Sequence, residues 1–187
     1  MKYYTGVGSR ETPIPILSLM QQIATKLASE DYVLRSGGAE GADSAFEHGA
    51  KWQDVGCSVP EELKEIYLPW KGFGGSNSTL YTFTPEAVSI AKRIHPAWDK
   101  LKLGAKKLHT RNVYQVLGSD CKTPSDFLIC WTPQGKDVGG TRTAIVLARE
   151  HNIPIWNLAN IRDESVLSLA VRLSNLRLGD TLVKAGT

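Results

Sequence analysis

A short β-prone run, then a glycine-rich turn and then an amphipathic helix recur along this chain. Strands that alternate with helices in this way predict an α/β fold, with a Rossmann-like, open, mostly parallel sheet and helices on both faces. In such sheets, ligands bind at the carboxyl ends of the strands, where the glycine-rich turns fall. The predicted strands are residues 3–7, 32–35, 65–69, 127–131 and 153–156.

Amphipathic helices are expected between these strands. The first follows Thr12, a candidate N-cap, and Pro13, which suits the first position of a helix. Its apolar side chains recur at helical spacing from Ile16 to Ala28. The chain of 187 residues is 42% hydrophobic and 22% charged, a composition typical of one folded core. We therefore expect a single domain over residues 1–187.

A longer insert separates the third and fourth predicted strands, at about residues 80–118. Its first half, residues 85–102, has a helical pattern that Pro96 should break or kink, because proline cannot donate a backbone hydrogen bond. A second helix is expected at residues 106–118, and a C-terminal helix at about residues 163–178.

Composition and spacing argue against several classes of protein. The net charge of +3 is too small to imply a polyanionic partner by itself. The cysteines Cys57, Cys121 and Cys130 match neither a disulfide framework nor a zinc site, which favours a reduced, cytoplasmic setting. No apolar run approaches the roughly 18 residues of a membrane span, so no membrane partner is expected. The four histidines lack metal-ligand spacing, and the dinucleotide and P-loop fingerprints are missing, so neither a metal nor a cofactor is expected.

Three of the turns combine glycines with small hydroxyl residues. Backbone N–H groups in such turns approach an anion closely, and the N-terminus of the next helix adds positive potential, so phosphate is the expected ligand. The second turn also holds Glu40 and Asp43, which either cap the next helix or accept hydrogen bonds from ribose hydroxyls. The candidate ligand-binding residues of the three turns are Gly8, Ser9 and Arg10; Ser36, Gly37, Gly38 and Asp43; and Gly139, Gly140, Thr141 and Arg142.

Basic side chains are concentrated between residues 92 and 111, where Asp99 is the one acidic residue. Aromatic residues, including Trp98, are interleaved with them. Such a segment can follow a nucleic-acid backbone and stack bases, but a solvated helix face explains the lysines as well. The candidate nucleic-acid contacts are Lys100, Lys102, Lys106 and Lys107.

Four motifs, in their order along the chain, together resemble one known family. They are Gly8-Ser9-Arg10, residues 36–50, Arg111-Asn112 and residues 139–144. This set resembles the DNA-processing protein A (DprA/Smf) branch of the SLOG superfamily and, more distantly, its Lonely-guy (LOG) branch. The second motif, SGGAEGADSAFEHGA, is the long and specific one, and the resemblance spans about residues 3–158.

The resemblance implies a Rossmann-like sheet, a nucleotide or phosphate pocket built from these loops, and homodimers or higher homo-oligomers. It also adds Arg111 and Asn112 to the candidate ligand-binding residues. Because DprA proteins bind single-stranded DNA and help to load recombinase, the first expected function is single-stranded DNA binding in DNA recombination. The second is a receptor or sponge for a small nucleotide-derived signal of the cyclic nucleotide or ADP-ribose type.

A third expected function is hydrolysis of a nucleotide N-glycosidic bond, the reaction of LOG relatives. Those hydrolases carry a glutamate three residues after the threonine of their phosphate loop, and the matching position here is Ala144. Glu40 and Asp43 are therefore the remaining candidates for a catalytic acid. The missing glutamate makes an enzyme the least favoured of the three functions.

Overall fold

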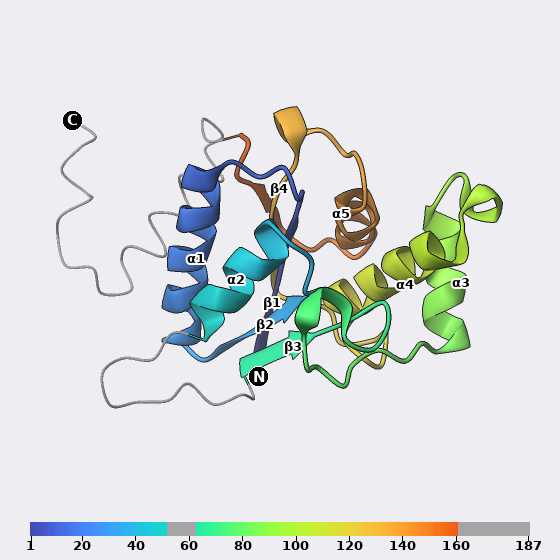
Figure 1. Cartoon of the computed structure of the whole chain (residues 1–187), viewed down its shortest axis with the longest axis horizontal. Helices are drawn as coiled ribbons and strands as arrows, with labels where there is room; N and C mark the ends of the chain where they lie inside the picture. Colours follow the sequence, from blue (N-terminus) through green and yellow to red (C-terminus); the bar gives the residue numbers. More distant parts are fainter. Residues whose placement is uncertain (52–62, 161–187) are drawn as a thin grey trace, which may run out of the picture.

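Five parallel strands form one sheet, in the order β3-β2-β1-β4-β5 (Figure 1). The computed structural model describes residues 1–51 and 63–160, to which all structural statements below refer. The predicted Rossmann-like α/β fold is confirmed, and every strand pairing in it is parallel. The strands are β1 (Lys2–Gly8), β2 (Tyr32–Ser36), β3 (Lys64–Ile66), β4 (Phe127–Trp131) and β5 (Ile155–Asn157).

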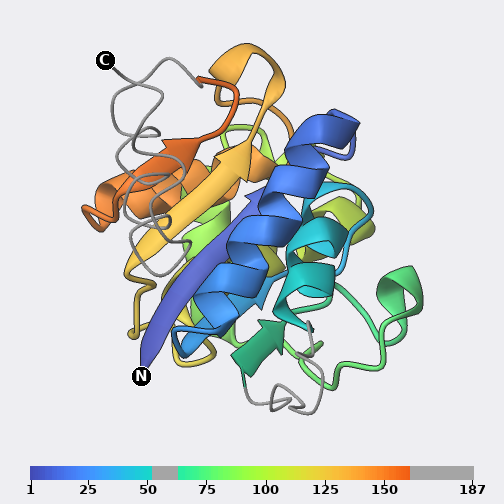
Figure 2. The same cartoon turned by 90° about the vertical axis from the view of Figure 1, so that its left-hand side faces the viewer.

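Helices cover both faces of the sheet. The helices α1 (Ile14–Ala28) and α2 (Ala42–Ala50) pack on one face, where Figure 2 shows them in front of the strands. The helices α4 (Leu103–Leu117) and α5 (Thr141–Glu150) pack on the other face. The helix α3 (Pro85–Ile94) lies outside this layer and contacts α4 and α5 (Figure 1).

Two apolar cores form because successive side chains of a strand point to opposite faces of the sheet. On the α1/α2 face, the ring of Tyr4 stacks on Phe127 and meets Phe46 edge to face. On the α4/α5 face, Leu128 and Cys130 are fully buried. The β4 segment is buried over most of its length, as expected for a strand covered by helices on both faces.

Several predicted boundaries differ from the observed ones. The first helix begins at Ile14 with no side-chain cap, and the Thr12 hydroxyl donates instead to the Ser9 carbonyl oxygen at 2.7 Å. The third strand ends at Ile66 rather than at residue 69, although the Tyr67 N–H still donates to the Ser36 carbonyl. The C-terminal helix expected at residues 163–178 lies outside the described residues.

The segment between β3 and β4 contributes directly to the fold. The helix α3 ends at Ile94, two residues before Pro96, so the predicted break is confirmed. The helix α4 begins at Leu103 and packs against β1 and β2. What the sequence indicated as a helical insert therefore supplies one of the two helices on this face of the sheet.

The connections place a crevice between β1 and β4. The chain leaves β1 toward β2 and β3 on one side and returns to β4 on the other side of β1. Loops that leave adjacent strands in opposite directions open a crevice at the carboxyl ends of those strands, and ligands of such sheets bind there. In the described part of the chain, no helix is both long enough and apolar enough to cross a membrane.

Candidate functional site

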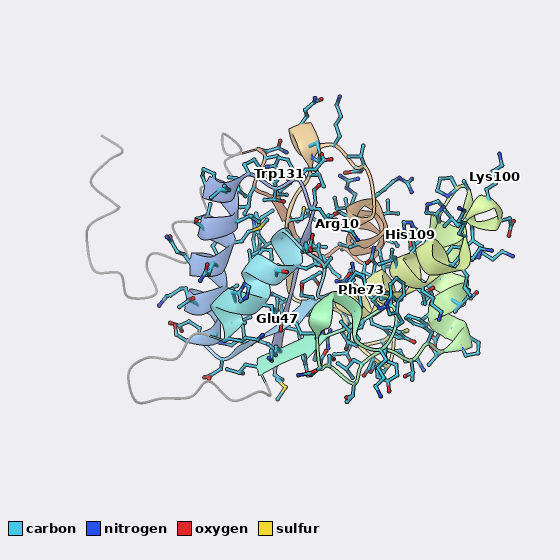
Figure 3. All side chains as sticks on the ribbon, viewed as in Figure 1. Arg10, Glu47, Phe73, Lys100, His109 and Trp131 are labelled. Carbon is cyan, nitrogen blue, oxygen red and sulfur yellow. The ribbon has the colours of Figure 1, made fainter. Side chains whose placement is uncertain are left out.

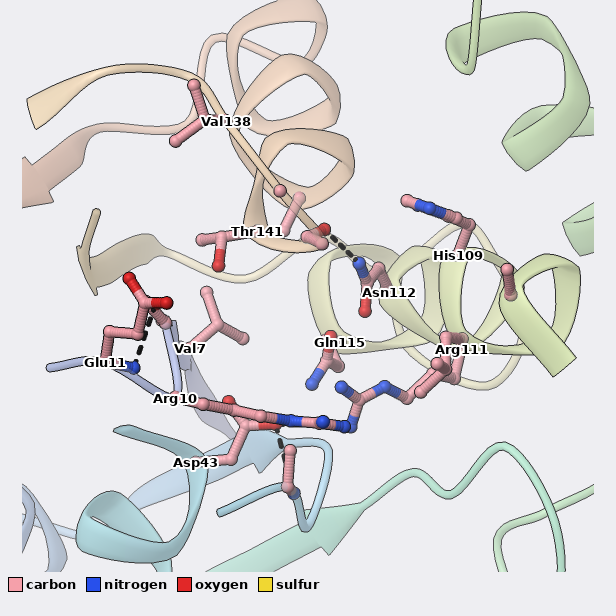
Figure 4. A pocket seen from close by; sticks show the side chains of 18 of the residues that line it. Val7, Arg10, Glu11, Asp43, His109, Arg111, Asn112, Gln115, Val138 and Thr141 are labelled. Atoms are coloured by element: carbon pink, nitrogen blue, oxygen red, sulfur yellow. Dashed lines mark hydrogen bonds and ion pairs between the residues drawn. The ribbon is translucent and has the colours of Figure 1, made fainter. Parts of the chain in front are cut away.

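A pocket of about 530 Å³ occupies this crevice (Figure 4). Its residues come from five places: the end of β1 and the turn after it, the turn after β2, the start of α2, one face of α4, and the loop and first turns of α5. Two of the predicted glycine-rich turns, after β1 and before α5, therefore meet at one rim. The second turn reaches the pocket through Ala39 and Asp43.

A buried ion pair forms one wall of the pocket. Nη1 of Arg111 lies 3.2 Å from Oδ2 of Asp43 and also donates to the Gly37 carbonyl oxygen. Both side chains are almost completely buried. Burial raises the pKa of Asp43, against the opposing influence of Arg111, while burial lowers the pKa of Arg111. The pair thus joins α4 to the start of α2 across the ends of the strands.

A second guanidinium, Arg10, enters the same pocket from the turn after β1. In Figure 4 its side chain extends toward Arg111, and its positive charge contributes to the lowered pKa of Arg111. Arg10 is exposed, and its side chain makes no hydrogen bond or ion pair within the described part of the chain. Asp43 already neutralises Arg111, whereas Arg10 has no ion-pair partner among the described residues and adds a positive charge to the pocket.

The N-terminus of α5 closes the opposite side. Gly139, Gly140 and Thr141 line the pocket, and no side chain of residues 1–51 or 63–160 caps the helix. Nδ2 of Asn112 donates to the Gly140 carbonyl oxygen at 2.7 Å and so ties this loop to α4. A helix N-terminus attracts negatively charged groups through its N–H groups and dipole. Arg10 and this helix end therefore present positive potential to the same space.

His109 lies on α4 near the mouth of the pocket. Its Nδ1 is 2.7 Å from Oγ1 of Thr143, and its ring centroid is 4.3 Å from that of His95. Burial, followed by the charges of His95 and two arginines, lowers the pKa of His109 to about 4. At neutral pH His109 is uncharged and acts as a hydrogen-bonding group of the pocket rim.

Several residues singled out in the sequence lie elsewhere. Oγ of Ser36 donates to the Gly6 carbonyl oxygen at 2.7 Å, so this hydroxyl is used inside the sheet. Glu40 is exposed and does not line the pocket. Nη1 of Arg142 is 3.4 Å from the Ile94 carbonyl oxygen, on the α3 side of α5. Lys100 lies at the outer end of the α3–α4 region, far from Arg10 (Figure 3).

Gly37 and Gly38 shape the second turn without lining the pocket. A Cβ on Gly37 would collide with Arg111 Nη1 and Gln115 Nε2, so only glycine leaves room for these side chains. Gly38 has a positive φ of 64°, a backbone conformation that glycine adopts readily. Both glycines therefore shape the turn and stand outside the residues that line the pocket.

The pocket also contains residues that sequence reasoning did not assign to a site. Gln115 and Leu108 lie on the same face of α4 as Arg111, as their helical spacing from it requires. This helical spacing can be seen in the sequence, but it identifies residues of the pocket only when the packing of α4 against the sheet is known. Glu11 adds a carboxylate at the exposed rim, next to Arg10 in the chain.

Within the described residues, no group of histidine, cysteine, aspartate and glutamate side chains is arranged to hold a metal ion. Comparison of the chain with family models, with curated proteins and with solved structures gave no significant match.

Proposed function

We propose that the protein binds a small phosphorylated nucleotide in the pocket between β1, β4 and α4. The observation that carries this proposal is the meeting of the free Arg10 guanidinium with the uncapped N-terminus of α5 at one rim. Both groups attract phosphate, one as a permanent cation and the other through its backbone N–H groups. The resemblance to the SLOG superfamily supports the same ligand class.

The size and lining of the pocket favour a small ligand. A volume of about 530 Å³ lies within the range of roughly 300–1,000 Å³ that is typical of small-molecule sites. Val7, Leu108 and Ala144 give it apolar walls, while Asp43 and Arg111 give it a polar side. This combination suits a sugar and a base that lie deeper than a phosphate bound at the rim.

The proposed function is binding rather than catalysis. Ala144, at the position where LOG hydrolases carry their glutamate, lines the pocket with a methyl group. Glu40 does not line the pocket, and Asp43 is engaged by Arg111. N-glycoside hydrolysis stays a prediction, and chromatography of nucleoside monophosphates incubated with the protein tests it by the release of free base.

Single-stranded DNA binding, in recombination or otherwise, also stays a prediction, as do the homodimer and the cytoplasmic location. Lys100 and Lys102 are exposed, but Lys100 lies far from Arg10, at the outer end of the α3–α4 region (Figure 3). A DNA strand that used both would have to follow the surface between them. Titration of a fluorescent oligothymidine tests this, because phosphate contacts make the affinity fall steeply with salt.

Calorimetric titration with a panel of nucleoside monophosphates, cyclic nucleotides and ADP-ribose tests the proposed function. At least one of them should bind, and Arg10→Ala should weaken that binding by about 1.5–3 kcal/mol, the usual value of a hydrogen bond to a charged group. Lys100→Ala is the matched control, since it removes an exposed positive charge far from the pocket. An Arg10→Ala variant with wild-type affinity for every bound nucleotide would show that the phosphate lies elsewhere.

A further inference from the structure

Gln115 is a buried side chain with unused hydrogen-bonding capacity. It is only 1% exposed, it lines the pocket, and neither Nε2 nor Oε1 has a hydrogen-bonding partner among the described residues. Nε of the neighbouring Arg111 likewise has no hydrogen-bonding partner within the residues that the structure describes. A buried polar group without a partner costs about 1–3 kcal/mol, so such groups point to a role beyond packing.

The fold does not require an amide at this position. The link from α4 to the sheet runs through the backbone carbonyl of Gln115, which accepts a hydrogen bond from Oγ1 of Thr5 at 2.6 Å. Any residue supplies that carbonyl. The side chain instead occupies, with Arg111, the space that Gly37 leaves open by lacking a Cβ. A methionine of similar size would fill the same space and leave no amide unpaired.

The carboxamide lies in the inner wall of the proposed nucleotide pocket, beside Arg111. Figure 4 shows Gln115 beside the Arg111 guanidinium, on the side that faces Val7 and Asp43. Val7 and Leu108 are among the apolar side chains that line the same pocket. A flat group with apolar faces and a polar edge matches such surroundings, and among the parts of a nucleotide this describes the base.

We infer that Gln115 reads the base of the bound nucleotide and selects adenine. The carboxamide presents a donor and an acceptor side by side in one plane, and the adjacent N6 amino group and N7 of adenine complement both. Guanine offers two acceptors, O6 and N7, along the same edge, so Oε1 would face an oxygen. Its own matching pair, O6 and N1–H, lies on the other edge of the ring, so guanine would pair with the carboxamide only after turning in the pocket. The inference rests on the proposed function, and it names the base that the same site recognises.

Titration calorimetry with three ligands tests this selection: adenosine 5′-monophosphate, guanosine 5′-monophosphate and purine riboside 5′-monophosphate, which lacks the 6-amino group. The wild-type protein should bind the adenine nucleotide roughly ten- to a hundredfold more tightly than either of the others, as expected for one bidentate contact. Gln115→Met should remove most of this preference. Gln22→Met, on an exposed part of α1, is the control and should keep it.

A stability measurement separates reading of the base from a structural role. Because the Gln115 amide has no hydrogen-bonding partner in the described part of the chain, Gln115→Met should leave the urea midpoint unchanged or raised. A large loss of stability would mean that the amide supports the fold, and it would overturn the inference.

Other outcomes distinguish the two proposals. Tighter binding of the guanine nucleotide, or an unchanged adenine preference in Gln115→Met, overturns the role of Gln115 while the pocket remains a nucleotide site that Arg10→Ala weakens. If no nucleotide of either panel binds the wild-type protein, the proposed function fails, and the inference fails with it.

Discussion

Arg111 is positioned by groups from two other segments of the chain. Its Nη1 contacts both Asp43 and the Gly37 carbonyl oxygen, so one guanidinium connects α4 with the turn after β2 and with α2. The pair is buried, and the desolvation of two charges offsets much of their attraction. We conclude that the pair fixes the shape of the pocket wall more than it adds to net stability.

This account predicts a strong coupling between Arg111 and Asp43. Arg111→Met leaves the Asp43 carboxylate buried without its partner and should lower the free energy of unfolding by about 3–5 kcal/mol. Asp43→Asn in the same chain should restore part of that loss. Urea unfolding of the wild type, the two single variants and the double variant measures the coupling. Strictly additive effects would show that the two side chains act independently.

His109 gives the protein a predicted acid sensitivity. The folded state holds its pKa at about 4, compared with 6.5 for an unperturbed histidine. As the pH falls from 6.5 toward 4, His109 becomes protonated in the unfolded chain but stays neutral in the folded chain. Protonation therefore favours the unfolded chain, and the free energy of unfolding decreases over this pH range. His109→Asn, which retains a hydrogen-bonding group near Thr143, should lose less stability than the wild type over that range.

Urea midpoints of both proteins between pH 7 and pH 4 check this expectation. His151→Asn is the control, because His151 is exposed. The histidine contribution would be refuted by parallel pH profiles of the wild type and His109→Asn.

At the scale of elements, α1 and α2 approach each other closely at Gly49. A Cβ on this residue would collide with the Gln21 backbone oxygen and lie 2.7 Å from Cβ of Ala24. The Gly49 carbonyl oxygen also accepts a hydrogen bond from Oγ1 of Thr25 at 3.1 Å. The absence of a side chain at Gly49 therefore allows α2 to lie against α1, and this packing in turn sets where the start of α2 places Asp43.

We predict that Gly49→Ala destabilises the protein by about 1–3 kcal/mol, the usual cost of overpacking, although alanine favours helix by about 1 kcal/mol over glycine. Gly104→Ala in α4 is the matched control, because the nearest atom to its Cβ would be a Trp70 ring carbon at 3.9 Å. That variant should be as stable as the wild type or slightly more stable. Thermal and urea unfolding distinguish them, and equal midpoints for the two variants would argue against close helix packing at Gly49.

At the scale of the whole molecule, the pocket joins segments that are distant in the sequence. The turn after β1, the start of α2, the face of α4 and the N-terminus of α5 all contribute to it. A ligand that bridges them should slow local opening of all four together, because opening any one of them breaks contacts with the ligand. It should also raise the stability of the molecule by about 2.7 kcal/mol at a hundredfold excess over the dissociation constant.

Hydrogen exchange measures this linkage. With saturating adenosine 5′-monophosphate, we expect added protection at residues 8–12, 39–43, 108–115 and 139–144, and little change at residues 98–102, which lie outside the pocket. Protection confined to residues 98–102 would place the bound nucleotide near Lys100 and Lys102 instead of in the pocket.

The strands and most helices could be predicted from the sequence because their signals are local. The apolar run of β4 and the break before Pro96 depend on neighbouring residues alone, and both were located correctly. The sequence also indicates Arg10, Asp43 and Arg111, which line the pocket: the first two follow from their turns and Arg111 from a family resemblance. The conclusion that their turns share one rim required the strand order.

What the sequence alone determined is the α/β class and the turns that follow its strands, since both arise from periodicity and from the conformational freedom of glycine. The tertiary structure decided which side chains enter the pocket. Thr141 and Ala144 line it, whereas Arg142 contacts α3, because consecutive residues of a helix point in different directions. Gln115 became part of the site only because α4 packs over the strand ends, a contact between residues far apart in the chain.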